Sequence, residues 1–157
     1  SVTEAEVKLA LVYNMTRFIS WPATDNDESF DLCLAGDTAY EIALENLRGR
    51  KIGERDIRVS LLEEAVDGPA ECDLVYVTHD EADFAATLLE RYEGLPVLMV
   101  SDAPDFIDDG GMVALSIDNG RVGMTINVAA YESVGLSVSS QLLELAQVVD
   151  GDRSTGG

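Results

Sequence analysis

The sequence predicts a single three-layer α/β domain, with a mixed, mostly parallel sheet, helices on both faces and a C-terminal β-hairpin. Apolar strand candidates alternate with helix candidates as far as residue 100, which is typical of parallel βα units. Two further strand candidates flank Asp118-Asn119-Gly120, and Asn-Gly is a strong signal for a tight hairpin. A length of 157 residues suits one domain. We assign residues 1–150 to it and residues 151–157 to a disordered tail.

The chain begins with a predicted helix over residues 3–19. Thr3 is its expected N-cap, because Glu6 follows at capping-box spacing. Pro22 ends this segment, since proline cannot continue a helix. The apolar residues that recur at helical spacing are predicted to face inward. They form the set Val7, Ala10, Leu11, Met15 and Phe18, with Asn14 on the same face.

The remaining elements follow from apolar alternation and from turn residues. Strands are expected over residues 30–35, 56–62, 72–78, 97–100, 112–117 and 121–126, and helices over 39–47, 80–92, 128–134 and 139–149. Asp80 and Asn127 are the expected N-caps of two of these helices. The sequence contains no internal repeat and no linker long enough to divide it.

The composition is strongly acidic. Thirty Asp and Glu residues against ten Lys and Arg give a formal charge of −20, which repels phosphate backbones and argues against nucleic-acid binding. The acids are scattered from Glu4 to Asp152. This even distribution of acidic residues favours the interpretation that the surface is kept hydrated in a salty medium. The alternative is an acidic face that binds a basic partner or a cation. No apolar run approaches the roughly 20 residues that cross a bilayer, so we expect no membrane insertion.

Catalytic motifs are missing from the sequence. It has no G-x-G-x-x-G, no G-x-x-x-x-G-K-[ST] and no G-x-S-x-G, so we expect neither a cofactor nor an enzyme. A phosphotransfer receiver domain needs a lysine at a strand end. Neither Lys8, in the first helix, nor Lys51, in a turn, is expected to supply it. The acidic stretch 25–28 lacks the glycine and the terminal Glu of a calcium loop. The carboxylates of Asp102, Asp105, Asp108 and Asp109 could hold a hard cation, but acidic surface loops are expected in so acidic a chain, so no metal site is predicted.

Four polar residues mark the predicted carboxyl ends of strands, where open α/β sheets bind ligands. They are Asp37, Thr38, His79 and Asp102. This arrangement keeps open a small-ligand-binding sensory module and, more remotely, a hydrolase that uses His79, the one histidine.

Cys33 and Cys72 lie in apolar strand candidates. The residues alone favour two inert core thiols. A bridge between them would instead close a loop of 39 positions. Such a loop would stabilise the fold by about 4 kcal/mol in the chain-entropy estimate. The sequence starts at Ser1 without a methionine, which fits the earlier removal of an export signal.

Three stretches, in this order and spacing, resemble one protein family. The first is Leu-Val-Tyr-Asn-Met-Thr-Arg-Phe-Ile-Ser-Trp-Pro at residues 11–22. The second joins residues 30–37 to residues 71–77. The third comprises residues 96–102, 110–112, 119–122, 126–127 and 135–143. Together they cover about residues 4–149 and resemble the YfiR family of bacterial periplasmic proteins.

The resemblance implies an exported, periplasmic, non-catalytic protein that forms homodimers. It implies a regulator that binds the periplasmic part of a membrane-anchored diguanylate cyclase, or of a related inner-membrane receptor. The regulator restrains that protein and lowers cyclic-di-GMP signalling and biofilm formation. The family's cysteine pair matches Cys33 and Cys72, so the resemblance implies a disulfide, with redox control through it. A second pair, found in some members, has no counterpart in residues 101–113.

The charge yields a first prediction, that the fold loses stability as salt is removed. Self-repulsion among 30 acids is screened over about 8 Å at physiological ionic strength and over about 30 Å at 0.01 M. Thermal unfolding at low and high sodium chloride measures the effect. A melting temperature independent of salt would contradict it.

Overall fold

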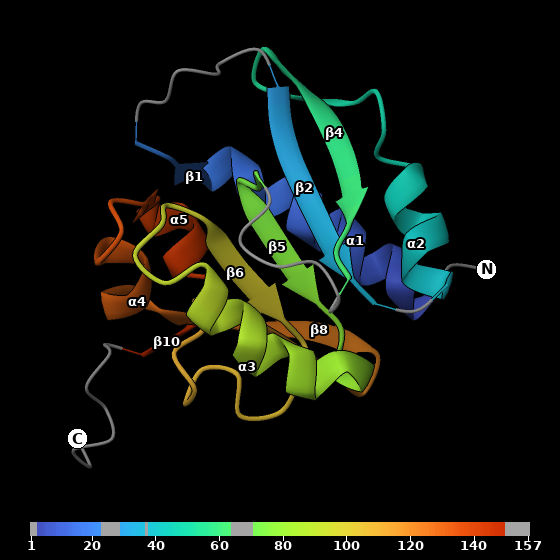
Figure 1. Cartoon of the computed structure of the whole chain (residues 1–157). Coiled ribbons are helices and arrows are strands. Elements are labelled where there is room, and N and C mark those ends of the chain that lie inside the picture. The colour runs from blue at the N-terminus through green and yellow to red at the C-terminus, as the bar shows by residue number, and fades with distance from the viewer. Residues whose placement is uncertain (1–2, 23–28, 37, 64–70, 150–157) are drawn as a thin grey trace.

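A mixed sheet of eight strands runs through the part of the chain that the computed structural model describes, residues 3–22, 29–36, 38–63 and 71–149 (Figure 1). In chain order its strands are β2 (Ser29–Ala35), β3 (Lys51–Ile52), β4 (Arg55–Leu61), β5 (Leu74–Val77), β6 (Leu98–Ser101), β7 (Val113–Asp118), β8 (Arg121–Asn127) and β10 (Gln147–Val149). Their spatial order is β10-β8-β7-β6-β5-β2-β4-β3. Strands β4, β2, β5, β6 and β7 are parallel, whereas β8 runs antiparallel to β7 and β3 antiparallel to β4. The predicted mixed, mostly parallel sheet is confirmed.

Helices cover both faces of this sheet. They are α1 (Glu4–Met15), α2 (Thr38–Glu45), α3 (Ala82–Arg91), α4 (Val128–Glu132) and α5 (Ser140–Leu143), with short 3₁₀ turns η1 (Thr16–Phe18) and η2 (His79–Glu81). Helix α2 connects β2 to β4, and α3 connects β5 to β6 in the opposite direction along the sheet. Right-handed crossovers in opposite directions place their helices on opposite faces. Figure 1 shows α3 in front of the sheet and α1 and α2 behind it.

The strand order reverses between β2 and β5. The chain passes from β2 outward to β4 and then returns to β5 on the other side of β2. All seven residues of β2 and all four of β5 are buried, so this pair lies at the centre of the core. The crevice beyond the carboxyl ends of two such strands is the usual ligand position in open α/β sheets.

Helix α1 begins as the sequence predicts, but it buries a partly different face. The capping box is present: Thr3 Oγ1 accepts from Glu6 N at 3.1 Å, and Glu6 Oε1 accepts from Thr3 N at 3.1 Å. The predicted inward face was partly wrong: Met15 is buried and Leu11 and Phe18 pack against the core, but Val7, at 37% exposure, Ala10 and Asn14 are exposed. The buried residues of α1 are Ala5, Lys8, Leu9, Val12 and Met15. These five residues recur at helical spacing along one face of α1, and one of them is a lysine.

The C-terminal region departs from the prediction at its edge strand. The helix predicted over 139–149 is wrong, because α5 ends at Leu143 and β10 pairs in parallel with β8. An open sheet edge presents unpaired N–H and C=O groups, and β10 satisfies part of that edge. A two-stranded antiparallel pair of β1 (Ile19–Ser20) and β9 (Ser137–Val138), which the sequence did not indicate, joins the end of η1 to the region before α5.

The predicted hairpin is confirmed. Asn119 and Gly120 have φ of 54° and 79°, the positive values that a type I′ turn needs. Asn127 caps α4, as expected, by accepting from Ala130 N at 3.4 Å. The tail predicted over 151–157 lies outside the described residues. Among the described helices, none is both long and apolar enough to cross a bilayer.

Candidate functional site

The four polar residues predicted at the strand ends are only partly brought together. Asp102 follows β6, and His79 begins η2 directly after the end of β5. His79 Nδ1 lies 3.4 Å from Asp102 Oδ2. Thr38 is an exposed residue at the start of α2, and Asp37 lies outside the described residues. The described geometry therefore centres on Asp102.

Asp102 holds helix α1 to the strand ends. Its side chain is 2% exposed, and its Oδ2 accepts hydrogen bonds from Lys8 Nζ, in a very close ion pair, and from Tyr40 Oη at 3.3 Å. Lys8 also binds Glu4 Oε2 at 2.8 Å, one helical turn away. The expectation that Lys8 cannot reach a strand end was wrong. It arrives there from the buried face of α1.

Burial sets the protonation of this cluster. Burial lowers the pKa of Lys8, but hydrogen bonds to Asp102 and then Glu4 outweigh it and raise the pKa above 10.5. Burial, with the nearby Asp102 charge, raises the pKa of Tyr40 to about 12 and raises that of Tyr76 further. A general acid or base works best with a pKa near the working pH. At neutral pH, Lys8 keeps its charge and both tyrosines stay neutral, so these three groups do not exchange protons.

Two buried polar atoms of the cluster remain unsatisfied. Within the described residues, Asp102 Oδ1 and Tyr76 Oη have no hydrogen-bond partner of acceptable geometry. The Tyr40 and Tyr76 rings meet edge to face with centroids 5.7 Å apart. Unpaired buried oxygens cost free energy unless water or another group reaches them.

Backbone contacts beside the cluster are structural. A Cβ at Gly36 would lie 2.5 Å from Thr78 Cγ2, so only glycine lets the end of β2 approach β5 this closely. Thr78 Oγ1 donates to the carboxylate of Asp80 in a very close contact. Asp80 therefore lies inside η2, and its predicted role as the N-cap of α3 was wrong, since Glu81 occupies that position.

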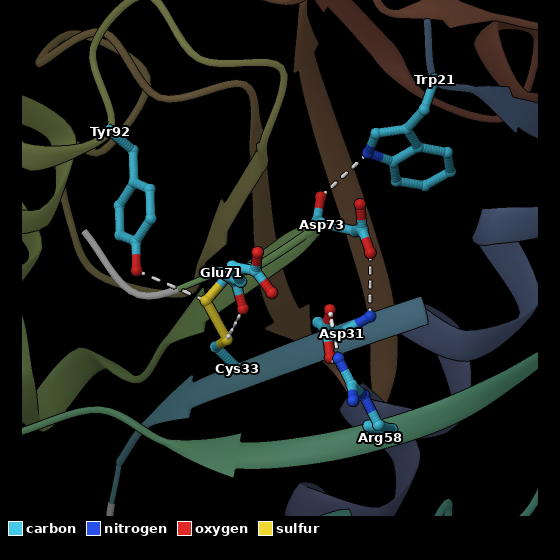
Figure 2. Close-up of a disulfide and its surroundings, with 8 residues drawn as sticks. Trp21, Asp31, Cys33, Arg58, Glu71, Asp73 and Tyr92 are labelled. Carbon is cyan, nitrogen blue, oxygen red and sulfur yellow. Dashed lines mark hydrogen bonds and ion pairs between the residues drawn. A yellow bond between two sulfur atoms is a disulfide. The ribbon is translucent and has the colours of Figure 1, made fainter. Parts of the chain in front are cut away.

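The structure contains the Cys33–Cys72 disulfide that the resemblance implied. Cys33 is fully buried on β2, and Cys72 is half-buried two residues before β5. Tyr92, at the end of α3, lies with its Oη 3.3 Å from Cys72 Sγ (Figure 2). A disulfide sulfur carries no proton, so the phenol is the donor. The bridge thus joins β2, the chain entering β5 and the end of α3.

Asp73 organises the polar surroundings of the disulfide. Its carbonyl accepts from Trp21 Nε1 at 2.9 Å, and its carboxylate accepts from Asp31 N at 2.9 Å (Figure 2). The carboxylate also accepts from Arg55 Nη2 at 3.2 Å. Burial raises the pKa of Asp73, against the opposing effect of the Asp31 amide and Arg55. Arg58 binds the Asp31 carboxylate through two bonds of 2.9 and 3.2 Å.

Sequence reasoning missed these groups, although one signal was present. Asp31 and Asp73 each interrupt an apolar strand candidate. A carboxylate at such a position must find a cation or N–H donors, because an unpaired charge is not tolerated in a core.

The fold and its covalent tie define a class of protein: a disulfide-bonded, doubly wound α/β domain. The model of the YfiR/HmsC-like family matches residues 5–147, and the chain belongs to that family. The family includes periplasmic regulators of diguanylate cyclases.

One solved structure with a similar fold is a conserved domain protein from Vibrio cholerae O1 biovar El Tor, at a TM-score of 0.61 and 11% identity. The alignment covers 96% of this chain and 61% of that chain, so this chain spans about three fifths of the other's length. At that identity the likeness shows the fold alone. No curated protein matches the sequence.

The disulfide yields a prediction on stability. Reduction breaks the bond between two cysteines that are 39 positions apart in the sequence. Opening a loop of this length destabilises the fold by about 4 kcal/mol in the chain-entropy estimate. For a domain of this size we expect the melting temperature to fall by roughly 10 °C. Circular dichroism with and without reductant measures it. The Cys33→Ala/Cys72→Ala variant should have a melting temperature close to that of the reduced protein, and reductant should not change it. A wild-type melting temperature that reductant leaves unchanged would contradict the prediction.

The Lys8–Asp102 pair yields a prediction on charge burial. Lys8→Met leaves Asp102 charged and buried, which should destabilise the fold by about 3–5 kcal/mol. Lys8→Met/Asp102→Leu removes both charges and should recover most of that loss. Chemical denaturation of both variants tests this. A double variant as unstable as Lys8→Met would contradict it.

The same pair makes stability fall in alkali. The pKa of Lys8 is raised on folding, so its contribution is fully present below pH 10.5 and is lost as pH rises above it. Tyr40 acts in the same direction, since unfolding returns its pKa from about 12 to 10.0. Denaturation between pH 9 and pH 12 should show a shallower decline in the Lys8→Met/Asp102→Leu variant.

Proposed function

We propose that this protein binds the periplasmic part of a membrane-anchored diguanylate cyclase, or of a related inner-membrane receptor, and restrains it without catalysing a reaction. Restraint lowers cyclic-di-GMP signalling and hence biofilm formation. Membership of the YfiR/HmsC-like family over residues 5–147 carries the proposal. A homodimer is the expected form of the regulator.

The arrangement of polar groups supports a binding role. Asp102 is committed to Lys8 and Tyr40, and Asp73 to Trp21, Asp31 and Arg55. His79 is 56% exposed beside Asp102. Within the described residues, no group of three or more His, Cys, Asp or Glu could hold a metal. These contacts stabilise the fold and leave recognition to the surface.

Redox control is part of the proposal. Cys72 is half-buried while Cys33 is fully buried, so an attacking thiolate reaches Cys72 Sγ and expels Cys33 as the leaving thiolate. Reduction removes the tie between β2 and the chain entering β5 and releases the Tyr92 contact. We expect the reduced protein to loosen and to lose its partner.

Crosslinked capture tests the proposal. The oxidised protein is crosslinked in its own cell envelope, and the partners are identified by mass spectrometry. We expect an inner-membrane protein with a periplasmic segment and a cyclase domain, together with a crosslinked homodimer. The Cys33→Ala/Cys72→Ala variant, expressed at equal level, should recover less of the cyclase. Recovery of the protein alone would contradict the proposal.

Cyclic-di-GMP content provides the functional readout. Deleting the gene should raise cyclic-di-GMP, and restoring the wild-type chain should lower it again, because the restraint is removed and returned. A deletion that leaves cyclic-di-GMP unchanged would contradict restraint even where the two proteins crosslink.

A small-ligand-binding module is the second candidate. The unsatisfied Asp102 Oδ1 and Tyr76 Oη favour it, because buried oxygens without a protein partner are groups that a bound polar molecule would satisfy. His79, Asp102, Thr38 and Asp37 are the residues proposed for this role. Native mass spectrometry of the purified protein separates the candidates, since a retained metabolite favours the module.

A further inference from the structure

A groove of about 560 Å³ runs between α1 and α2. Its floor is apolar and buried, from Leu9 on α1 and Ala43 and Leu47 on the α2 side. Its rim is polar, with the carboxamides of Asn14 and Asn46 exposed along it. An apolar floor with a polar rim is the usual composition of a recognition groove.

Two arginines on this rim lack carboxylate partners. Within the described residues, neither Arg17 nor Arg50 forms an ion pair, although the chain carries 30 acids and 10 cations. The cations that do form ion pairs are Lys8, Arg48, Lys51, Arg55 and Arg58. Arg91 and Arg121 form no ion pair in the described residues either, but Arg17 and Arg50 line the same groove. With Glu6 as the one carboxylate in its lining, the groove carries a net positive charge in a strongly acidic protein.

The arginine end of the groove is held in place by Tyr13. The Arg50 guanidinium lies over the Tyr13 ring, 5.7 Å from its centroid. Tyr13 Oη donates to the Lys51 carbonyl at 2.8 Å, which fixes the ring. A guanidinium placed on a ring can still present its N–H groups in its plane to a carboxylate.

The groove is elongated. Its lining residues on the α1 side run from Glu6 to Arg17, which spans about 16 Å at a rise of 1.5 Å per residue. That length matches about five residues of extended chain. At the far end, the Glu6 carboxylate is already engaged by Thr3. The groove is therefore apolar along its floor and cationic at the Arg17 and Arg50 end.

We propose that this groove binds an acidic segment of the protein's periplasmic partner, with carboxylates on Arg17 and Arg50 and apolar side chains over Ala10 and Tyr13. The identity of the partner rests on the proposed function, whereas the chemistry of the segment rests on the groove. At physiological ionic strength, the interaction between charges more than about 8 Å apart is largely screened. Direct contact between the segment's carboxylates and the two arginines therefore outweighs the repulsion from more distant acidic side chains. The rest of the acidic surface therefore repels acidic segments, whereas the groove binds them.

A peptide titration tests the groove directly. The probe is a labelled peptide that alternates Glu with Leu over about six residues, and its control replaces each Glu by Gln. We expect the acidic peptide to shift amide resonances of α1 and α2. Arg17→Gln and Arg50→Gln should each weaken its binding about tenfold, because each removes a charge-assisted bond. The Gln peptide should bind the wild type as weakly as the acidic peptide binds the double variant.

Arg121→Gln is the matched control, since Arg121 is an exposed hairpin residue outside the groove. It removes the same charge and should leave binding unchanged. Equal weakening by Arg121→Gln, shifts confined to residues outside 6–17 and 43–50, or no binding would overturn the proposal. Inorganic phosphate that shifts the same resonances as strongly as the peptide would also overturn it, in favour of a small anion. Melting temperatures of all variants exclude misfolding.

Crosslinked capture separates this proposal from the proposed function. If the wild type captures the cyclase and Arg17→Gln/Arg50→Gln does not, both stand. If both proteins capture it equally, the regulator stands and the groove proposal falls. If the peptide binds as expected and no cyclase is recovered, the groove takes an acidic segment and the regulator proposal falls.

Discussion

The ion pair between Lys8 and Asp102 fixes how α1 lies on the sheet. A buried ammonium must keep a carboxylate partner, because an unpaired charge in the core would be far more costly than the pair. Lys8 therefore has to point at the end of β6, which rotates α1 so that Leu9, Val12 and Met15 face the core. The same rotation brings Ala10, Tyr13 and Arg17 to the side that faces α2. The groove is thus a consequence of the buried pair.

The disulfide and the Asp73 contacts act on the same pair of strands. Strands β2 and β5 meet where the strand order reverses, so no short connection joins them. Cys33 and Cys72 supply a covalent connection, and the Asp73 carboxylate binds the Asp31 amide beside it. Asp102, which follows the neighbouring β6, instead connects α1, α2 and η2 through Lys8, Tyr40 and His79. The disulfide also contacts the residue that follows α3, because Tyr92 Oη donates to Cys72 Sγ.

Local sequence signals predicted what depends on local physics. The capping box of Thr3 and Glu6 and the Asn119-Gly120 turn need only neighbouring residues, and both were predicted correctly. The burial of Lys8 depends on Asp102, 94 positions away, so periodicity reasoning missed Lys8 and placed the exposed Val7 and Asn14 inward. The edge strand β10 depends on the free edge of β8 in the same way. The groove arginines could not be recognised in advance, because being unpaired is a property of the folded surface.

The distribution of cations explains how so acidic a protein can still be selective. Within the described residues, five Lys and Arg side chains neutralise carboxylates that folding brings close, as Arg58 does for Asp31 and Arg55 for Asp73. The remaining acids repel any acidic protein that approaches at random. A regulator with such a surface needs only a short cationic stretch to choose a partner, because the rest of its surface rejects the alternatives. Since the lining residues come from α1 and α2, the buried Lys8–Asp102 pair that fixes α1 also maintains the surface available for recognition.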